Sequence, residues 1–338
     1  MPERNLVQAV RDALYEEMER DDRVCILGED VGRKGGVFKA TEGLQQRFGE
    51  QRVLDTPLAE SSIAAVAQGL ALEGFLPVAE MQFADYSFPA FNQIVNEIAK
   101  VRYRSNGDFG CPLVIRAPTG GGVRGALYHS QSPEAFYCHV PGLKVVLPST
   151  PADAKGLLKA AIRDPDPVIF LEPKKLYRAE RQEVGDGDAA VLPIGVATVV
   201  RPGTDLTAVT YGFMRAVTIQ AASRLSADGI EVEIIDLRSL RPWDAESCVG
   251  RSRKPVALPS SMRRTAPADL GRRLRLSLLS GASPASTPRS AGLPARMSRP
   301  CRLVRVSNTR SCSIPTRLPM ACAELPATEA RIPNLRTS

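Results

Sequence analysis

Two residues in the first half of the chain, Glu60 and His129, have the type and the surroundings that proton transfer requires. Glu60 begins a run in which no other charge occurs until Glu73. A carboxylate in the first turn of a helix can serve only to complement the helix dipole and cap free N–H groups. Because this helix is apolar on all sides, we expect it to be buried. A buried carboxyl group has a raised pKa and can exchange a proton near neutral pH.

His129 and His139 are the two histidines of the chain. His129 follows the glycine-rich stretch TGGGVRGALY, which is typical of a long loop at the carboxyl end of a strand, where parallel sheets bind ligands. We therefore predict that His129 gives or takes a proton near physiological pH. His139 precedes the next strand through a Pro-Gly turn, and for it we predict a structural role.

The segments around these residues alternate between helical and strand patterns. Apolar residues at helical spacing predict helices over 5–20, 61–74, 88–104, 151–164 and 215–229. Short apolar runs predict strands over 24–30, 76–81, 111–118, 143–149, 167–173, 205–212 and 230–240. This alternation predicts an α/β fold with a doubly wound parallel sheet over 1–178, covered on both faces. A polar connector then leads to a smaller α/β domain over 186–246.

Residues 247–338 differ sharply from the rest of the chain. They contain 17 of the 44 Lys+Arg but 3 of the 37 Asp+Glu, so they carry +14, whereas residues 1–246 carry −7. They also lack aromatic residues and contain 11 prolines. One interpretation is a natural disordered basic tail, and the other is a translated frameshift. We favour the frameshift, because the apolar strand and helix that should complete the second sheet are missing.

Other features narrow the class of protein. No apolar run reaches the roughly 18 to 20 residues that span a bilayer, and the first 22 residues resemble neither a secretory nor a transit peptide. Seven irregularly spaced cysteines without a CxxC pair predict reduced thiols rather than a zinc or disulfide framework. We expect a bacterial cytoplasmic protein.

Four long segments carry a family resemblance. DTPLAE, AEMQFADYSFPAFNQIVNEIAKVRYRS, GALYHSQSPEAF and PGLKVVLPSTPADAKGLLKAAIRDPDPVIFLEPKKLYR occur in this order. The chain resembles, over residues 4–246, the beta subunits of thiamine-diphosphate-dependent 2-oxo acid dehydrogenases, most of all the branched-chain members. Pyruvate and acetoin dehydrogenases are the near alternatives. The resemblance implies a transketolase-like pyrimidine-binding domain over 1–178 and the start of a transketolase C-terminal-like domain over 186–246.

The resemblance also assigns roles to residues. It implies that Glu60 hydrogen-bonds the aminopyrimidine ring of thiamine diphosphate and moves the proton that activates the thiazolium carbon. Tyr86 would pack against that ring, and Leu58 and Gln82 would contact the cofactor. The alternatives are core packing for Tyr86 and Leu58 and a solvated strand end for Gln82. His129 would orient the 2-oxo acid and assist acyl transfer to a lipoyl sulfur.

An ion and several partners are implied as well. A potassium site would be formed by Leu113, Val114, Ala161, Asp164 and Asp166, although two aspartates that flank a proline can also mark a turn. GDG at 185–187 is not followed at the family spacing by the asparagine of a magnesium site. The diphosphate and Mg²⁺ would therefore be held by an alpha subunit in an α2β2 tetramer, which docks on a lipoyl acyltransferase core. We expect no membrane or nucleic-acid partner. The alternative of another class is a noncatalytic basic nucleic-acid-binding protein.

Overall fold

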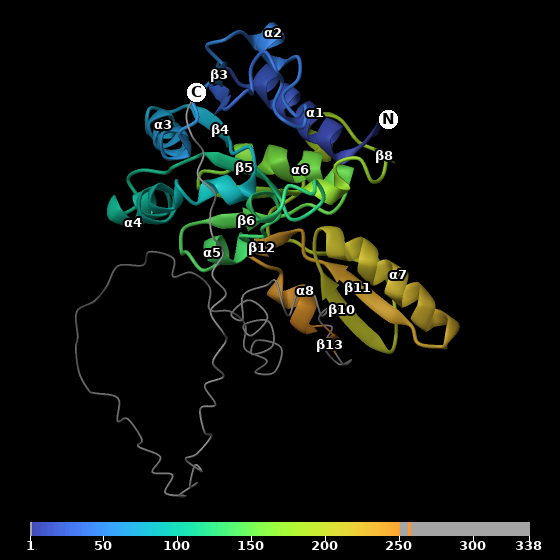
Figure 1. Ribbon diagram of the computed structural model, residues 1–338. Coiled ribbons are helices and arrows are strands. Elements are labelled where there is room, and N and C mark those ends of the chain that lie inside the picture. Colours follow the sequence, from blue (N-terminus) through green and yellow to red (C-terminus); the bar gives the residue numbers. More distant parts are fainter. Residues whose placement is uncertain (1, 251–255, 258–338) are drawn as a thin grey trace, which may run out of the picture. The chain divides into compact units, whose positions relative to one another are not determined.

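A computed structural model describes residues 2–250 and 256–257 (Figure 1). The strands are β1 (Glu3–Arg4), β2 (Val24–Gly28), β3 (Val53–Asp55), β4 (Leu76–Glu80), β5 (Val114–Thr119), β6 (Lys144–Val146), β7 (Val168–Pro173), β8 (Gln182–Glu183), β9 (Thr198–Arg201), β10 (Leu206–Thr210), β11 (Val232–Asp236), β12 (Ser239–Arg241) and β13 (Val256–Ala257).

The helices include short 3-10 and π turns, labelled η. They are α1 (Leu6–Arg20), α2 (Leu44–Phe48), α3 (Glu60–Leu72), η1 (Ala84–Ser87), η2 (Gln93–Glu97), η3 (Ile98–Lys100), α4 (Val101–Arg104), η4 (Leu127–His129), α5 (Glu134–Cys138), α6 (Pro151–Ile162), η5 (Lys174–Leu176), η6 (Gly187–Ala190), α7 (Phe213–Ala227) and α8 (Ala245–Gly250).

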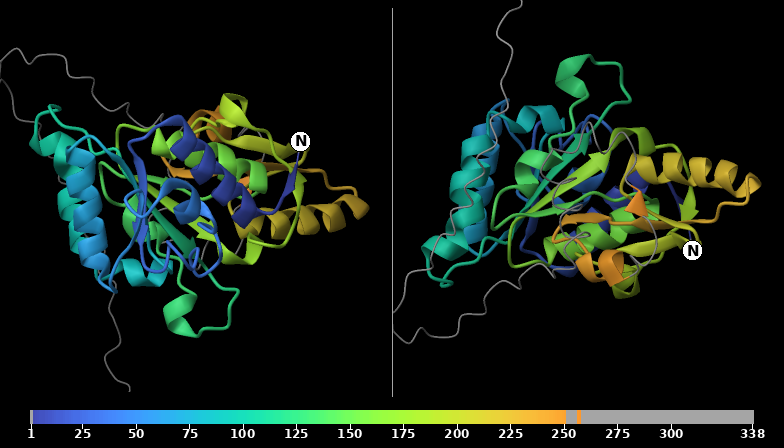
Figure 2. Two further views of the ribbon diagram at one scale, coloured as in Figure 1. Left: turned by 90° about the horizontal axis from the view of Figure 1, so that it is seen from above. Right: turned by 90° about the horizontal axis from the view of Figure 1, so that it is seen from below.

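The large sheet has the strand order β12-β6-β7-β5-β4-β2-β3, and every strand except β12 is parallel to its neighbours. Successive side chains of a strand point to opposite faces, so Ile26 and Val114 pack with α1 and α6, whereas Leu27 and Ile115 pack with α3. Both faces are therefore covered by helices, as Figures 1 and 2 show, and the doubly wound α/β fold is confirmed.

Local sequence accounts for the two helices that pack together on one face. Helix α1 begins after Asn5, whose side chain accepts from the Gln8 N–H at 3.0 Å, while the Gln8 side chain accepts from the Asn5 N–H at 3.1 Å. Helix α6 begins after Thr150, which caps the Asp153 N–H, with Pro151 in the first turn. These caps place both helix starts where the polar-to-apolar pattern predicts them.

Two helical predictions need correction. Helix α3 is not buried on all sides, because Val66 and Leu72 are 52% and 44% exposed on the face opposite Ile63 and Ala67. Its apolar residues on that face are exposed among residues 2–250 and 256–257. The segment 88–104 is not one regular helix, since it contains a π turn, a 3-10 turn and the short α4.

The second sheet has the order β13-β10-β11-β9, with β9 antiparallel to β11 and the other pairs parallel. Helix α7 packs against β10 and β11 (Figure 1). Strand β12 leaves this sheet and joins the edge of the large one beside β6.

The regular structure extends past the point where the sequence suggests that it stops. Helix α8 continues through Gly250, with the Cys248 side chain buried, and Val256–Ala257 pairs with β10. Helix α8 therefore crosses the expected boundary at residue 247, and the start of an atypical tail stays a prediction. The interpretation of residues 251–255 and 258–338 as a basic tail or a frameshift lies outside the described residues.

Candidate active site

The predicted site residues gather at the carboxyl edge of four neighbouring strands, β5, β4, β2 and β3. Leu58 and Glu60 follow β3, Gln82 and Tyr86 follow β4, and His129 lies on the loop after β5. Helix α3 contacts η1, which contains Tyr86, and η1 contacts η4, which contains His129. A hydrogen bond of 2.6 Å from the Ser61 hydroxyl to the Pro89 carbonyl joins the start of α3 to the segment after η1.

Glu60 is buried, as predicted, with 9% of its surface exposed at the first position of α3. A second carboxyl group, which the sequence analysis missed, lies near it. Glu29 follows β2 and is 7% exposed, and its Oε1 atom has no hydrogen-bond partner within the described residues. Burial and the nearby charge of Glu60 raise the pKa of Glu29. Glu29 and Glu60 thus place two buried carboxyl groups at the same edge of the sheet.

His129 is held by two hydrogen bonds, one at each ring nitrogen. Its Nδ1 lies 2.8 Å from the Gly125 carbonyl, which can only accept, so in the neutral ring Nδ1 carries the proton. Its Nε2 lies 2.9 Å from the Tyr86 hydroxyl, which donates to it. The Phe83 ring packs edge-on against the imidazole, with the ring centres 4.4 Å apart. The structure thus brings Tyr86 and His129 into direct contact.

The loop that carries His129 depends on a glycine. A Cβ atom at Gly125 would lie 2.6 Å from His129 Cγ, closer than any side chain allows. Its neighbours Arg124 and Ala126 have φ angles of 52° and 56°, in the left-handed region that such residues rarely adopt. Strained backbone of this kind is concentrated at functional sites.

Asp85 contacts the same loop, and Lys174 contacts β5, which leads into it. The sequence predicted neither residue. The buried Asp85 carboxylate accepts from the Gln131 N–H at 3.1 Å. The Lys174 ammonium lies 5.3 Å from the centre of the Phe83 ring and donates to the Pro118 carbonyl at 3.3 Å. Burial lowers the pKa of Lys174 to about 8, although the Asp85 charge opposes this shift. No local pattern marks these residues, because their partners come from other strands.

The other candidates lie where a ligand or a partner can reach them. Leu58 is 79% exposed, so core packing is wrong as an explanation for it. Gln82 and Tyr86 are half-buried. His139 is exposed at the end of α5, away from the loop of His129.

The residues of the expected potassium site do not fit an ion well. The Lys144 ammonium donates to both oxygens of Asp164 at 2.6 Å, and Arg102 bonds Asp166 at 2.5 Å. The carbonyl of Leu113 accepts a backbone N–H from the next strand, and that of Ala161 accepts from the Asp164 N–H. Val114 lies within β5. The protein itself therefore supplies the positive charge at this turn.

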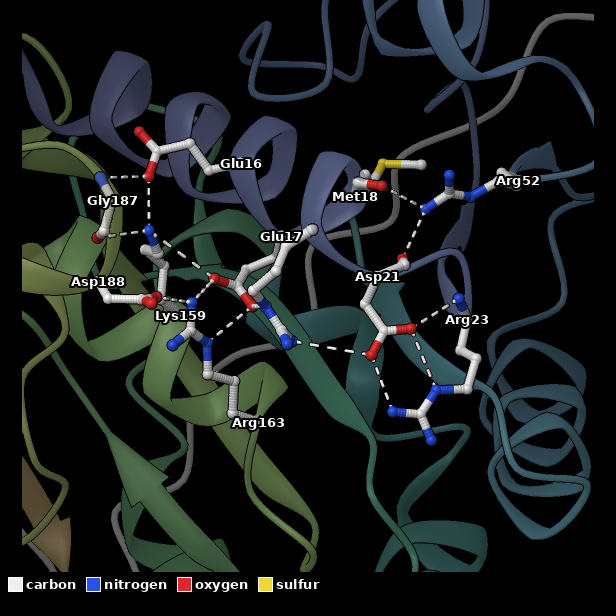
Figure 3. A network of polar contacts seen from close by, with 11 residues as sticks. Glu16, Glu17, Met18, Asp21, Arg23, Arg52, Lys159, Arg163, Gly187 and Asp188 are labelled. Atoms are coloured by element: carbon white, nitrogen blue, oxygen red, sulfur yellow. Dashed lines mark hydrogen bonds and ion pairs between the residues drawn. The ribbon is translucent and has the colours of Figure 1, made fainter.

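The GDG sequence at 185–187 has a structural role. The Asp186 carboxylate pairs with the buried Lys155 ammonium at 2.7 Å, and the Gly187 carbonyl accepts from Lys159 at 2.8 Å. Figure 3 shows the surrounding network of charges, which ties the connector to α1 and α6. The aspartate of this sequence is thus paired with a lysine of α6.

Comparisons with known proteins agree with the α/β fold described above. The transketolase pyrimidine binding domain family matches residues 3–180, and the transketolase C-terminal domain family matches residues 195–264. A solved structure described as a split gene transketolase, inactive beta4 tetramer, has a TM-score of 0.64 and 24% identity over 83% of this chain and 86% of that chain. That likeness shows the fold.

Curated relatives narrow the family. The chain is 59% identical over 248 residues to 2-oxoisovalerate dehydrogenase subunit beta of Bacillus subtilis (strain 168), which covers 73% of this chain and 76% of that protein. It is 48% identical over 254 residues to pyruvate dehydrogenase E1 component subunit beta of the same organism, which covers 75% and 78%. The chain therefore belongs to the family of 2-oxo acid dehydrogenase beta subunits, oxidoreductase components with a transketolase-like fold.

Proposed function

We propose that this chain is the beta subunit of a thiamine-diphosphate-dependent dehydrogenase that decarboxylates branched-chain 2-oxo acids and transfers the acyl group to lipoyl. The observation that carries the proposal is the buried Glu60–Glu29 pair beside the Tyr86–His129 contact, at the carboxyl edge of the sheet. The lipoyl disulfide is the oxidant, because one sulfur takes the acyl group while the other leaves as a thiol.

The residues present fit the aminopyrimidine half of thiamine diphosphate. Bound there, the cofactor would supply the nucleophilic carbon and accept the electrons released on decarboxylation. Glu60 would hold a proton at the ring nitrogen in a site with little water, and the unpaired Oε1 of Glu29 keeps a second proton acceptor nearby. The half-buried Tyr86 would pack against the ring beside Leu58 and Gln82. A potassium ion at Asp164 would have to displace Lys144, so we give it no role.

His129 would act on the acyl-transfer step. Its neutral imidazole presents Nε2, held by the Tyr86 hydroxyl, toward the same edge of the sheet. This nitrogen can accept the proton from a lipoyl thiol or return it. His129→Ala is therefore expected to slow lipoyl acylation more than decarboxylation, and an equal loss in both steps would contradict this role.

The proposal includes an alpha subunit that holds the diphosphate and Mg²⁺. The paired Asp186 is unavailable for a metal, and the open apolar face of α3, with Val66 and Leu72, offers a surface for such a partner. We further propose an α2β2 assembly that binds a lipoyl acyltransferase core. We also propose two domains, over residues 1–178 and 186–246, with β12 of the second domain added to the sheet of the first.

The test is Glu60→Gln in the chain reconstituted with an alpha subunit, thiamine diphosphate and Mg²⁺. We expect release of CO2 from 3-methyl-2-oxobutanoate to fall by at least about 100-fold, which is the lower range for a general acid or base. Assembly, measured by sedimentation, should not change. Glu73→Gln, on the exposed end of the same helix, is the matched control. Full turnover in Glu60→Gln would disprove the proposed site.

Substrate preference is tested separately. The higher identity to the 2-oxoisovalerate member supports a pocket for branched chains. Because each methylene contributes about 1 to 3 kcal/mol, we expect kcat/KM for 3-methyl-2-oxobutanoate to exceed that for pyruvate by roughly tenfold or more. The reverse order would assign the chain to pyruvate while leaving the roles of Glu60 and His129 in place.

A further inference from the structure

A cavity lies between the large sheet and the second domain, apart from Glu60 and Tyr86. Its volume is about 190 Å³. Thr119 and Gly121 at the end of β5 line one side, and Tyr211, Phe213 and Met214 of the second domain line the other. An apolar cavity of roughly 150 Å³ holds a benzene molecule. This one therefore has room for the body of a small organic molecule.

The cavity contains a carboxyl oxygen without a partner. Glu134, at the start of α5, is 4% exposed, and its Oε1 accepts a long hydrogen bond of 3.3 Å from the Tyr211 hydroxyl. Its Oε2 has no hydrogen-bond partner within the described residues. An unsatisfied buried polar atom costs about 1 to 3 kcal/mol, so this oxygen favours a ligand that donates a hydrogen bond or carries positive charge.

Most of the remaining wall is apolar, although Thr119 and Ser132 add hydroxyl groups, and a positive charge lies at the rim. Leu147, Pro173 and Met214 offer hydrocarbon surface. The exposed Lys175 places its ammonium 4.6 Å from the centre of the Phe213 ring. The neighbouring Lys174 also lines the cavity, and its ammonium donates to the Pro118 carbonyl. The cavity thus has an acidic interior, apolar sides and a basic rim.

We propose that this cavity binds a small aliphatic amino acid. Its ammonium group donates to Glu134 Oε2, its side chain packs against Leu147 and Met214, and its carboxylate lies at the rim near Lys175. An anion without an ammonium group would meet the Glu134 carboxylate, and a hydrocarbon would leave Oε2 unpaired. Burial raises the pKa of Glu134, and an ammonium ligand would favour its charged form.

Such a ligand would contact the loop that carries His129. Thr119 and Gly120 hold this loop through the Gln131 carbonyl, which accepts from the Gly120 N–H at 2.9 Å. The Gln131 N–H in turn binds Asp85, which lies one residue before Tyr86. Occupation of the cavity would therefore restrain the loop from the side opposite to Tyr86.

The test uses the full chain without thiamine diphosphate or an alpha subunit, so it does not depend on the proposed catalytic function. Binding of L-leucine, 3-methylbutylamine and 4-methylpentanoate is measured by saturation-transfer NMR. We expect L-leucine to bind, the amine to bind more weakly and the carboxylate not to bind. Equal binding of 4-methylpentanoate and L-leucine would overturn the proposal, and so would no transfer to L-leucine at millimolar concentration.

Two variants test the location. Glu134→Gln keeps an acceptor for Tyr211 but loses the charge, so we expect L-leucine to bind at least about tenfold more weakly. Gly121→Leu fills the cavity, since a Cβ atom there meets only Lys175 Cε at 4.0 Å, and decides the question if the first variant does not fold. Asp22→Asn, with a fully exposed side chain, is the control. Unchanged L-leucine binding in Glu134→Gln, or in Gly121→Leu, would refute the site.

Discussion

The hydroxyl of Tyr86 and Nε2 of His129 lie 2.9 Å apart, and this contact determines how the imidazole is presented. Because the Gly125 carbonyl accepts a hydrogen bond from Nδ1–H, Nε2 of the neutral ring carries no proton and accepts a hydrogen bond from the tyrosine hydroxyl. Tyr86, which belongs to the proposed cofactor pocket, thus orients His129, which acts in the proposed acyl-transfer step.

Tyr86→Phe should weaken acyl transfer while leaving the aromatic packing intact. The lost hydrogen bond is worth about 0.5 to 1.5 kcal/mol, which corresponds to a roughly 2- to 12-fold fall in kcat/KM for the lipoyl substrate. Single-turnover acylation of a lipoyl domain would measure it. Tyr128→Phe, on an exposed neighbouring ring, is the control. A rate equal to that of the unchanged protein would show that the contact does not position His129.

The pKa of Glu29 should fall when Glu60 is neutralised. Three effects raise this pKa, burial first, the charge of Glu60 second and the charge of Asp30 third, and Glu60→Gln removes the second. NMR titration of ¹³C-labelled glutamate side chains would follow the change, with Glu73→Gln as the control. A Glu29 titration that is unchanged in Glu60→Gln would mean that the two carboxyl groups are not coupled.

Asp236 should make stability depend on pH. It is fully buried at the end of β11, and burial, together with the Asp153 charge, raises its pKa to about 7, against a hydrogen bond from Ser149. The folded state therefore holds a proton that the unfolded state loses near pH 4, so this contribution is complete below pH 4 and is lost as the pH rises to about 7.

Asp236→Asn keeps an acceptor for Ser149 and should flatten this dependence. The proton on Asp236 contributes on the order of 4 kcal/mol at most to the free energy of unfolding. Thermal unfolding from pH 4 to 8 would show it, as a melting temperature that falls with pH in the unchanged protein but less in the variant. The control is Asp22→Asn, on the surface. Parallel pH curves for the two proteins would contradict the assignment.

Arg116 should be essential for stability. It lies in the middle of the large sheet, 1% exposed, and forms ion pairs with the buried carboxylates of Glu80 and Glu172. Arg116→Leu leaves both buried carboxylates without a cation, although Tyr177 still donates to Glu172, and this is expected to cost about 3 to 5 kcal/mol of unfolding free energy. Arg23→Leu, which removes an exposed ion pair with Asp21, should cost far less.

Denaturant unfolding would measure both variants. Burial raises the pKa of Glu80 and Arg116 opposes this, so Glu80 should hold a proton more firmly in folded Arg116→Leu, and the stability of the variant should fall further as the pH rises. If Arg116→Leu loses no more unfolding free energy than Arg23→Leu, water or a local rearrangement within the sheet compensates for the missing guanidinium group.

The order of helices and strands was predictable because each is marked locally. The Asn5 capping box, the Thr150-Pro151 start of α6 and the apolar runs of β2 and β7 are signals within a few residues. The burial of Glu60 at the start of α3 was predictable for the same reason, because this residue is the single charge at the head of an apolar helix.

Other features depend on contacts between distant segments. Glu29 joins Glu60 because β2 and β3 are neighbours in the sheet, and Asp85 supports the His129 loop through Gln131. Strand β12 pairs with β6 at the edge of the large sheet. The short segment 239–241 contains no local signal for this pairing. The exposure of Val66 shows that an apolar pattern on all sides of a helix does not by itself predict which side is buried.

Helix α3 also affects how the protein can be produced. With Ala65, Val66, Gly69 and Leu72 all exposed, the subunit made without a companion presents a continuous hydrocarbon stripe to solvent. Stripes of this kind promote self-association. Expression in isolation should therefore yield precipitate or non-native clusters in a concentration-dependent manner, and balanced synthesis of both polypeptides from one transcript should restore soluble material.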